Sequence, residues 1–235
     1  MISDIEKIAA GIYLEGLAVD TSREIIWYSD VVAGGIHALM PDGEVVCLNG
    51  DRMWTGGIMV NADGAVLSSG GGGIMWTNLT AGKSGWLLEG IPDEDVSGVN
   101  EMVPDGEGGL FFGTCDVEMV ESGGTPRPTQ IYRLTRDREL TKAADGVGFS
   151  NGIMYDPGKG RLYCNDTFCG TWTFDVQADL SLANKRMLVK KEDADGMALD
   201  ADGNIWITGF RSGSITRVTP GGELLAAVDT PADAI

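Results

Sequence analysis

Side chains that carry oxygen recur at the first position of short apolar segments. Glu15 opens EGLAVD, Asn100 opens NEMVPD, Asn151 opens NGIMYD and Asp195 opens DGMALD, while Gly56 holds the same position in GGIMVN. Two carboxylates and two amides are the oxygen ligands that Ca²⁺ and similar hard cations prefer. If these segments converge, they predict a metal site in which Gly56 leaves one sector open to water or ligand.

A simpler explanation of these positions is that they form turns. Asn-Gly and Asp-Gly pairs are common turn formers, and two of the segments begin with such a pair. However, Glu15 is no turn former, and Asn100 is followed by Glu101 rather than by glycine. The turn explanation therefore does not cover the whole set, and we favour the metal site.

The elements that must position these residues form a repeat. The five segments start 41, 44, 51 and 44 residues apart, and a period of about 40 to 50 residues is typical of four-stranded propeller blades. In each repeat a turn such as DADGN or DPGKG follows the first apolar run, and a second and a third run follow the turn. No segment has a convincing helical period. The sequence predicts an all-β propeller, whose first strands direct their opening residues toward one central channel.

Composition restricts the partners and the location. The chain has 235 residues, 43% of them hydrophobic, with a formal charge of −18, which disfavours binding to nucleic acid or to anionic membranes. Its four cysteines have neither zinc-ligand spacing nor the density of a disulfide framework, which indicates a cytoplasmic protein with reduced thiols. The N-terminal residues show neither a secretion signal nor a membrane span.

Three motifs, LEGLAVD, SNGIMYDPGKGRLYCNDT and DGMALDADGNIWITGFRSGSITRVTPGGEL, resemble those of the regucalcin/gluconolactonase (senescence-marker-protein) family of six-bladed β-propellers. The resemblance implies one divalent cation in the channel, held by a Glu, two Asn and an Asp. These roles fall on Glu15, Asn100, Asn151 and Asp195 as metal ligands. Ca²⁺ is the ion we expect, with Zn²⁺, Mg²⁺ and Mn²⁺ as alternatives.

About five blades are visible in the sequence. Since the resemblance is to six-bladed proteins, we expect residues 1–235 to form a single propeller domain that lacks its last blade, with a five-bladed ring as the alternative. We retain a homo-oligomer as an alternative to a monomer, because an open sheet edge can pair with a second copy.

One motif departs from the resemblance. Where sugar-lactone hydrolases of this family have Arg-x-Asn-Asp-Gly, this chain has GVNEM, with Gly98 in place of the Arg and Glu101 in place of the Asp. This change favours a ligand other than a sugar lactone. Glu101, Met102, Trp54 and Phe149 lie near the strand openings and are candidate substrate-binding residues for an apolar ligand, with ordinary core packing as the alternative.

The 51-residue interval contains an insertion, CDVEMVESGGTPRPTQ, after the second run of the third repeat. We expect this segment to overhang the site as a lid, with Met119 and Glu121 facing the substrate. A solvated acidic hairpin is the alternative.

The predicted activity is metal-dependent hydrolysis of a lactone or related ester. In this scheme the cation polarises the carbonyl group and a catalytic carboxylate, Asp195 or else Glu15, activates water. The single histidine, His37, lies in a third run away from the channel, so no histidine-based triad is expected. Two alternatives stay open: a non-enzymatic propeller that binds calcium or a partner, and a propeller that isomerises or cyclises an apolar metabolite.

Overall fold

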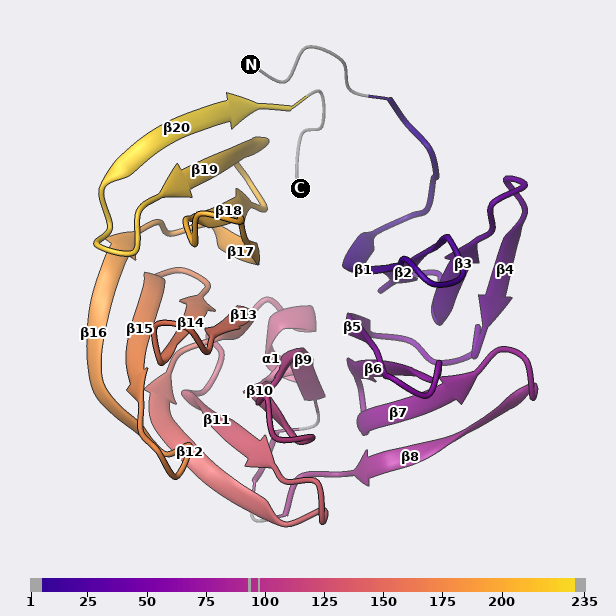
Figure 1. Ribbon diagram of the computed structural model, residues 1–235, viewed down its shortest axis with the longest axis horizontal. Helices are drawn as coiled ribbons and strands as arrows, with labels where there is room; N and C mark the ends of the chain where they lie inside the picture. The colour runs from indigo at the N-terminus through magenta and orange to yellow at the C-terminus, as the bar shows by residue number, and fades with distance from the viewer. Residues whose placement is uncertain (1–5, 93, 97, 231–235) are drawn as a thin grey trace. The chain divides into compact units, whose positions relative to one another are not determined.

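The computed structural model describes residues 6–92, 94–96 and 98–230, with the side chain of Glu121 outside the described part. These residues form four-stranded antiparallel sheets, each made of strands that are consecutive in the chain (Figure 1). The chain divides into two compact units, residues 1–101 and 102–235.

The first unit contains two sheets and the beginning of a strand that continues into the second unit. The first sheet is β1 (Leu14–Asp20), β2 (Ile25–Asp30), β3 (Ile36–Leu39) and β4 (Val45–Leu48). The second sheet is β5 (Thr55–Val60), β6 (Val66–Gly70), β7 (Gly73–Asn78) and β8 (Lys83–Glu89). The strand β9 (Gly98–Pro104) follows.

The second unit contains the other strands and one short helix. β9 pairs in a sheet with β10 (Leu110–Cys115), β11 (Thr129–Leu134) and β12 (Leu140–Val147), and α1 (Val117–Glu121) lies between β10 and β11. The next sheet is β13 (Ser150–Asp156), β14 (Arg161–Asp166), β15 (Gly170–Val176) and β16 (Leu182–Lys190). The last described sheet is β17 (Ala194–Leu199), β18 (Ile205–Gly209), β19 (Ser214–Val218) and β20 (Leu224–Asp229).

Aspartates close the hairpins between first and second strands. Asp200 accepts hydrogen bonds from the backbone N–H groups of Asp202 (3.0 Å) and Asn204 (2.9 Å), and Gly203 takes the positive φ of +75° that the turn requires. Asp105 similarly accepts from Glu107 N–H at 2.8 Å. An aspartate that bonds to the backbone two residues onward favours a tight turn, so these hairpins are determined by local sequence.

Apolar side chains fill the space between successive sheets. In the first unit, Trp27 and Ile36 of one sheet pack in the same cluster as Ile58 and Val66 of the next. In the second unit, an apolar cluster joins the sheets that contain β10 and β14, and another surrounds Ile205. Burial of these side chains is the main force that holds neighbouring sheets together.

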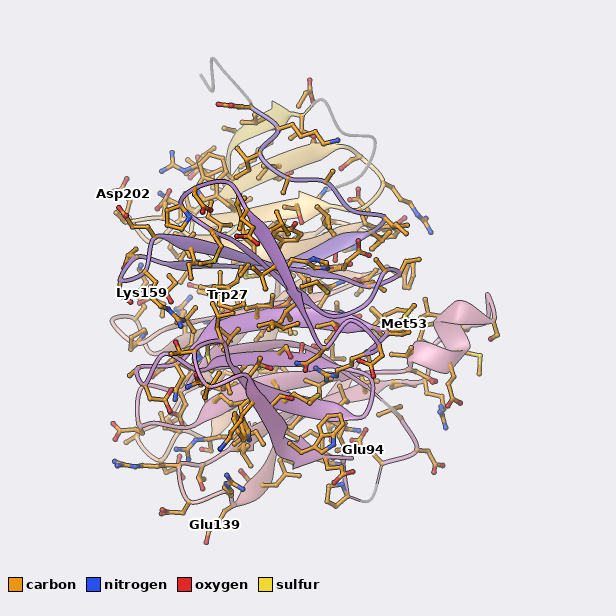
Figure 2. The ribbon with its side chains drawn as sticks, turned by 90° about the vertical axis from the view of Figure 1, so that its right-hand side faces the viewer. Trp27, Met53, Glu94, Glu139, Lys159 and Asp202 are labelled. Atoms are coloured by element: carbon orange, nitrogen blue, oxygen red, sulfur yellow. The ribbon has the colours of Figure 1, made fainter. Side chains whose placement is uncertain are left out.

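The turns and the helix mark the two ends of the strands in the second unit. Figure 2 shows α1 projecting at one end, while Lys159 and Asp202, in the turns after β13 and β17, lie at the opposite end. The first strands therefore begin at the end where α1 lies. Among the described residues, no helix has the length and apolar character needed to cross a bilayer.

Candidate functional site

The residues that open the first strands lie in β-bulges. In the pairing of β1 with β2, Leu14 faces Asp30 but Leu17 faces Tyr28, so that Glu15 and Gly16 together oppose a single residue. The same shift occurs in three further pairings of first with second strands, and it includes Gly56, Asn151 and Asp195. A bulge redirects the side chain that it contains. The repeat therefore has a backbone device at the positions where the sequence predicts metal ligands.

Glycine follows the opening residue because the neighbouring sheet approaches closely there. A Cβ atom on Gly16 would lie 2.3 Å from the carbonyl oxygen of Gly56, and one on Gly152 would lie 2.6 Å from that of Asp195. Real Cβ atoms do not come this close to backbone atoms. Gly16 and the Asn151-Gly152 pair thus serve close packing between sheets, in addition to any part in ligand binding.

A hydrogen bond from the preceding sheet holds the opening residue of three first strands. The Ser29 hydroxyl donates to the carbonyl oxygen of Gly56 at 2.7 Å, and the Ser69 hydroxyl donates to that of Asn100. The Asn165 amide donates to the carbonyl oxygen of Asp195 at 2.7 Å. This use of Ser29, Ser69 and Asn165 was not predicted from the sequence. The sequence does contain a signal for this role. In each sheet, the next-to-last residue of the second strand is Ser, Thr or Asn.

The first unit brings together the openings of β1, β5 and β9. A Cβ on Gly56 would meet the main-chain oxygen of Asn100 at 2.7 Å and its side-chain Oδ1 at 3.1 Å, so Asn100 takes the space that the sequence analysis expected to be open. The Glu101 carboxylate packs against the Cα of Gly57, where an added Cβ would lie 2.3 Å from Oε2. The strand of Glu15 and the strand of Asn100 and Glu101 thus both adjoin β5 within one unit.

The second unit brings Asn151 and Asp195 together. Both side chains are buried, and the Oδ1 atom of each has no hydrogen-bond partner among the described residues. The Nδ2 of Asn151 donates to the Thr167 hydroxyl at 3.2 Å, and that hydroxyl donates to the carbonyl oxygen of Ala194 at 2.9 Å. Because Thr167 engages the amide nitrogen, the carbonyl end of Asn151 is the end left for a ligand.

Burial raises the pKa of Asp195 to about 6. The adjacent Asn151 amide acts in the opposite direction, and the negative charge of Asp193 adds to the rise. A buried carboxylate without a counter-charge disfavours its ionised form, and a bound cation would remove that penalty.

The four predicted metal ligands include amides, which distinguishes them from a site made only of carboxylate, thiol and imidazole ligands. Over the described ranges, no cluster of three or more His, Cys, Asp or Glu residues is suited to a metal. The predicted set contains only two residues of these types, Glu15 and Asp195, and its other members are amides. The unpartnered buried oxygens of Asn151 and Asp195 fit a hard cation in their donor chemistry.

The predicted apolar substrate-binding residues differ in exposure. Trp54 is half-buried and has a positive φ of 54°, with its N–H bonded to the carbonyl oxygen of Val31. Met102 is only 6% exposed, in the interior of β9. Phe149 is 7% exposed and contacts the ring of Phe168, whose exposed fraction is 48%.

The insertion after β10 folds around α1 rather than as a hairpin. Arg127 and Asp116 close the segment, with Nε of Arg127 2.7 Å from Oδ2 of Asp116 and a second bond of 3.2 Å from Nη2 to Oδ1. The Arg127 guanidinium holds the pKa of the buried Asp116 carboxyl below its usual value. Met119 lies on α1 with its Sδ against Gly124, and the side chain of Glu121 is outside the described residues. The lid function stays a prediction.

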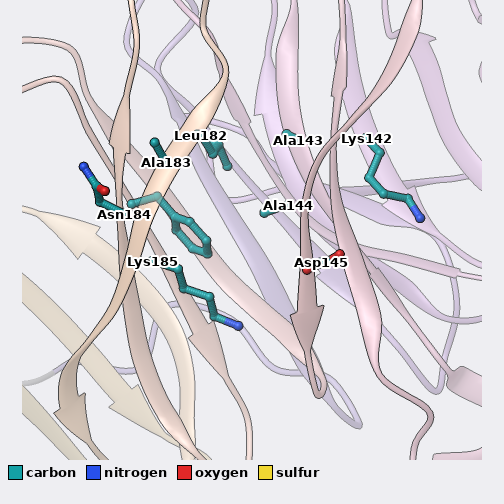
Figure 3. Close-up of a pocket in the computed structure, with 9 residues that line it drawn as sticks. Lys142, Ala143, Ala144, Asp145, Leu182, Ala183, Asn184 and Lys185 are labelled. Atoms are coloured by element: carbon teal, nitrogen blue, oxygen red, sulfur yellow. The ribbon is translucent and has the colours of Figure 1, made fainter.

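A cavity of about 380 Å³ lies elsewhere in the second unit (Figure 3). Its wall consists of Phe174 of β15 and residues of the fourth strands β12 and β16, including Lys142, Asp145 and Lys185. Lys185 is bonded through Nζ to the carbonyl oxygen of Gly146 at 2.6 Å. None of the predicted site residues lines this cavity, so we do not assign the chemistry to it.

The consecutive four-stranded sheets, with polar residues on the bulges of their first strands, define an all-β propeller. Solved structures share this fold: a gluconolactonase from Xanthomonas campestris superposes with a TM-score of 0.81 at 22% identity, covering 94% of this chain and 77% of that one. The profile described as "SMP-30/Gluconolactonase/LRE-like region" matches residues 14–235. The chain therefore belongs to the SMP-30/gluconolactonase/LRE-like family, as its motifs indicated.

The chain is also similar to curated proteins that are longer than itself, and it covers only part of their lengths. Pentonolactonase XacC of Haloferax volcanii is 22% identical over 233 residues, which cover 94% of this chain and 75% of that protein. Regucalcin of Danio rerio is 28% identical over 144 residues, 58% of this chain and 48% of that one. The chain spans about half the length of the regucalcins that it matches.

Proposed function

We propose that this protein is an enzyme, a metal-dependent hydrolase that acts on a lactone or a related ester. Family membership and similarity to a pentonolactonase over 94% of the chain support the reaction class. The observation that carries the proposal is the pair of buried, unpartnered oxygens, Oδ1 of Asn151 and Oδ1 of Asp195, on equivalent bulges of adjacent sheets.

The proposed metal ligands are Glu15, Asn100, Asn151 and Asp195. Their equivalent positions at the openings of first strands and their oxygen chemistry support Ca²⁺, with Zn²⁺, Mg²⁺ and Mn²⁺ as alternatives. A divalent ion bound to such a set would supply Lewis acidity toward a substrate carbonyl group.

The protein's own groups have defined tasks in this proposal. At the carboxylate oxygen that does not hold the ion, Asp195 accepts the proton of the water that attacks the carbonyl carbon, and Glu15 is the second candidate for that base. Thr167 orients Asn151 by accepting from its amide nitrogen. Asn165 fixes the bulge of Asp195 through the main chain, so that its carboxylate is directed by backbone geometry rather than by side-chain packing alone.

The test is hydrolysis of a panel of lactones, measured as the acid released at constant pH. Each lactone is assayed with Ca²⁺ present and again after chelation. We expect chelation to abolish turnover, and Asp195→Asn and Asn151→Ala to lower kcat/KM by at least about 100-fold. Asp202→Asn is the matched control, because its side chain is 82% exposed in a turn at the far end of the strands. Turnover that survives both chelation and Asn151→Ala would refute the proposal.

A second candidate is a propeller in which the ion is structural and no reaction occurs. Similarity to regucalcins over 58% of the chain keeps this candidate open. Calorimetry separates the two: a lower Tm on chelation, without turnover of any lactone by the Ca²⁺-loaded protein, favours the structural ion. An isomerase or cyclase would instead convert an apolar substrate without releasing acid.

We also propose a cytoplasmic location. All four cysteines, Cys47, Cys115, Cys164 and Cys169, have free thiols, which is the state that a reducing compartment maintains. Mass spectrometry of alkylated protein from intact cells tests this location, since a disulfide between any two of these cysteines would contradict it.

A further inference from the structure

Three phenylalanines and an arginine form an aromatic shelf at the strand openings of the second unit. The shelf comprises Phe149, Phe168, Phe210 and Arg211. The ring centroids of Phe149 and Phe168 are 6.5 Å apart, and those of Phe168 and Phe210 are 6.0 Å apart in an edge-to-face arrangement. The Arg211 guanidinium lies over Phe210 at 4.7 Å and over Phe168 at 5.8 Å.

The shelf has a buried ring on one side and exposed side chains on the other. Phe149 is 7% exposed, whereas Phe168 is 48% exposed, which is unusual for a large apolar residue. Phe210 is half-buried and Arg211 is exposed. An exposed ring that rests on a buried one presents a fixed apolar surface to a ligand.

The backbone at Phe168 is unfavourable for a bulky residue. Its φ of +75° lies in the left-handed region, which favours glycine. Three backbone hydrogen bonds hold the loop: Phe168 N–H to the oxygen of Glu192, Thr167 N–H to that of Phe149, and Cys169 N–H to that of Asp166. The last of these bonds closes a β-turn in which Phe168 is the third residue, a position that takes positive φ and favours glycine. The turn therefore explains the backbone conformation, and the unusual feature is a half-exposed phenylalanine at that position; strained non-glycine residues of this kind gather at functional sites.

The shelf is joined to the residues with unpartnered oxygens. Thr167, next to Phe168, accepts from the Asn151 amide and donates to the carbonyl oxygen of Ala194. Phe210 donates its N–H to the carbonyl oxygen of Asp193 at 3.1 Å. Short hydrogen bonds therefore connect the residue before Phe168 to Asn151, and Phe210 to the segment just before Asp195.

We propose that Phe168 and Phe210 determine specificity by stacking against the apolar substituent of the substrate, so that the ligand class is an aryl- or alkyl-substituted lactone. This inference rests on the proposed function and deepens it. Among the shelf side chains, only the Arg211 guanidinium can donate hydrogen bonds, so the shelf offers little to the several hydroxyl groups of a sugar ring. An aromatic or aliphatic group, in contrast, would bury itself against the two rings.

The first experiment compares γ-phenyl-γ-butyrolactone with unsubstituted γ-butyrolactone. For Phe168→Ser and Phe210→Ser we expect the ratio of kcat/KM values, aryl over unsubstituted, to fall at least about tenfold, mainly through KM. Leu225→Ser is the control, because this side chain is 45% exposed on β20 and its loss removes a similar apolar surface. An unchanged ratio in both phenylalanine variants would overturn the proposal.

A second measurement does not depend on hydrolysis. The lactam 5-phenyl-2-pyrrolidinone is not cleaved, and its binding to the Ca²⁺-loaded protein can be followed by calorimetry. We expect Phe168→Ser to raise its Kd about tenfold or more and Leu225→Ser to leave Kd unchanged. If no lactone is hydrolysed, the proposed function fails, yet lactam binding that depends on Phe168 still supports the shelf. No binding by the wild type, or equal binding by Phe168→Ser, contradicts the shelf alone.

Discussion

The side-chain amide of Asn165, in β14, donates a 2.7 Å hydrogen bond to the main-chain oxygen of Asp195, in the first strand of the next sheet. The same nitrogen reaches the oxygen of Gly196 at 3.2 Å, and the Asn165 Oδ1 accepts from the Thr171 hydroxyl at 2.7 Å. Asn165 is fully buried, and each end of its amide is engaged. It therefore connects the bulge that carries Asp195 to the sheet before it.

Replacement of Asn165 by Ala should destabilise the protein. The change removes the side-chain partner of the buried Asp195 carbonyl oxygen and of the buried Thr171 hydroxyl, which costs about 2–4 kcal/mol in the free energy of unfolding. Urea denaturation measures the effect. The control is Asn61→Ala, whose amide makes an exposed hydrogen bond to Asp63 and should change stability by less than about 0.5 kcal/mol. Equal stability of the two variants would show that the Asn165 hydrogen bonds do not stabilise the contact between the two sheets.

Two glycines at the same position of successive bulges should respond differently to alanine. A Cβ on Gly152 would lie 2.6 Å from the oxygen of Asp195 and 2.7 Å from the nitrogen of Met197, both backbone atoms. A Cβ on Gly196 would meet only the Thr208 hydroxyl oxygen, at 3.1 Å. We expect Gly152→Ala to cost about 2–3 kcal/mol and Gly196→Ala less than about 1 kcal/mol. The midpoints of urea unfolding test this order, and a reversed order would contradict close packing between β13 and β17.

The pair of Asp116 and Arg127 should make stability depend on pH. The pKa of Asp116 is lowered in the folded protein, chiefly by its hydrogen bond to Arg127. The stabilisation is therefore complete above the unfolded pKa of about 3.9 and is lost as pH falls through the lower folded value. Arg127→Met should lower stability at pH 7 by about 1–3 kcal/mol, because the buried carboxylate loses its partner.

The measurement is the free energy of unfolding of the wild type and of Arg127→Met at several pH values between 7 and 2. The difference in stability should shrink below about pH 4, as Asp116 takes up a proton in the unfolded chain. Lys159→Met serves as the control, since its ion pair with Asp156 is partly exposed and of little weight. A difference that is constant with pH would exclude the ion pair as its cause.

An exposed turn residue offers a gain in stability. Glu24, between β1 and β2, has a φ of +58° and an exposed side chain. Glycine adopts this conformation without strain, so Glu24→Gly should raise the free energy of unfolding by about 0.5–1 kcal/mol. In Glu89→Gly the same change falls in the strand β8, where it should lower stability by a similar amount. Thermal unfolding that gives both variants the same sign would contradict the assignment of strain at Glu24.

The amino-acid sequence by itself determined the strands and the family. The third run that contains His37 is confirmed as β3, and each predicted opening residue lies in the first strand of a sheet. This part was predictable because a hairpin depends on contacts between residues close in the chain, such as Asp200 with the backbone of the following turn. The repeat then shows each local signal five times.

Only the tertiary structure decided how neighbouring sheets meet. The sequence shows that glycine follows Asn151 and Asp195, but the reason at Gly152 is the backbone of Asp195, more than forty residues away. Likewise, Asn165 reads as an ordinary strand residue until its amide is found on another sheet. The helix α1 and the positive φ of Phe168 were also not predicted, because tertiary contacts and loop hydrogen bonds overcome weak local preferences. Such contacts join residues distant in sequence, and no pattern within one repeat records them.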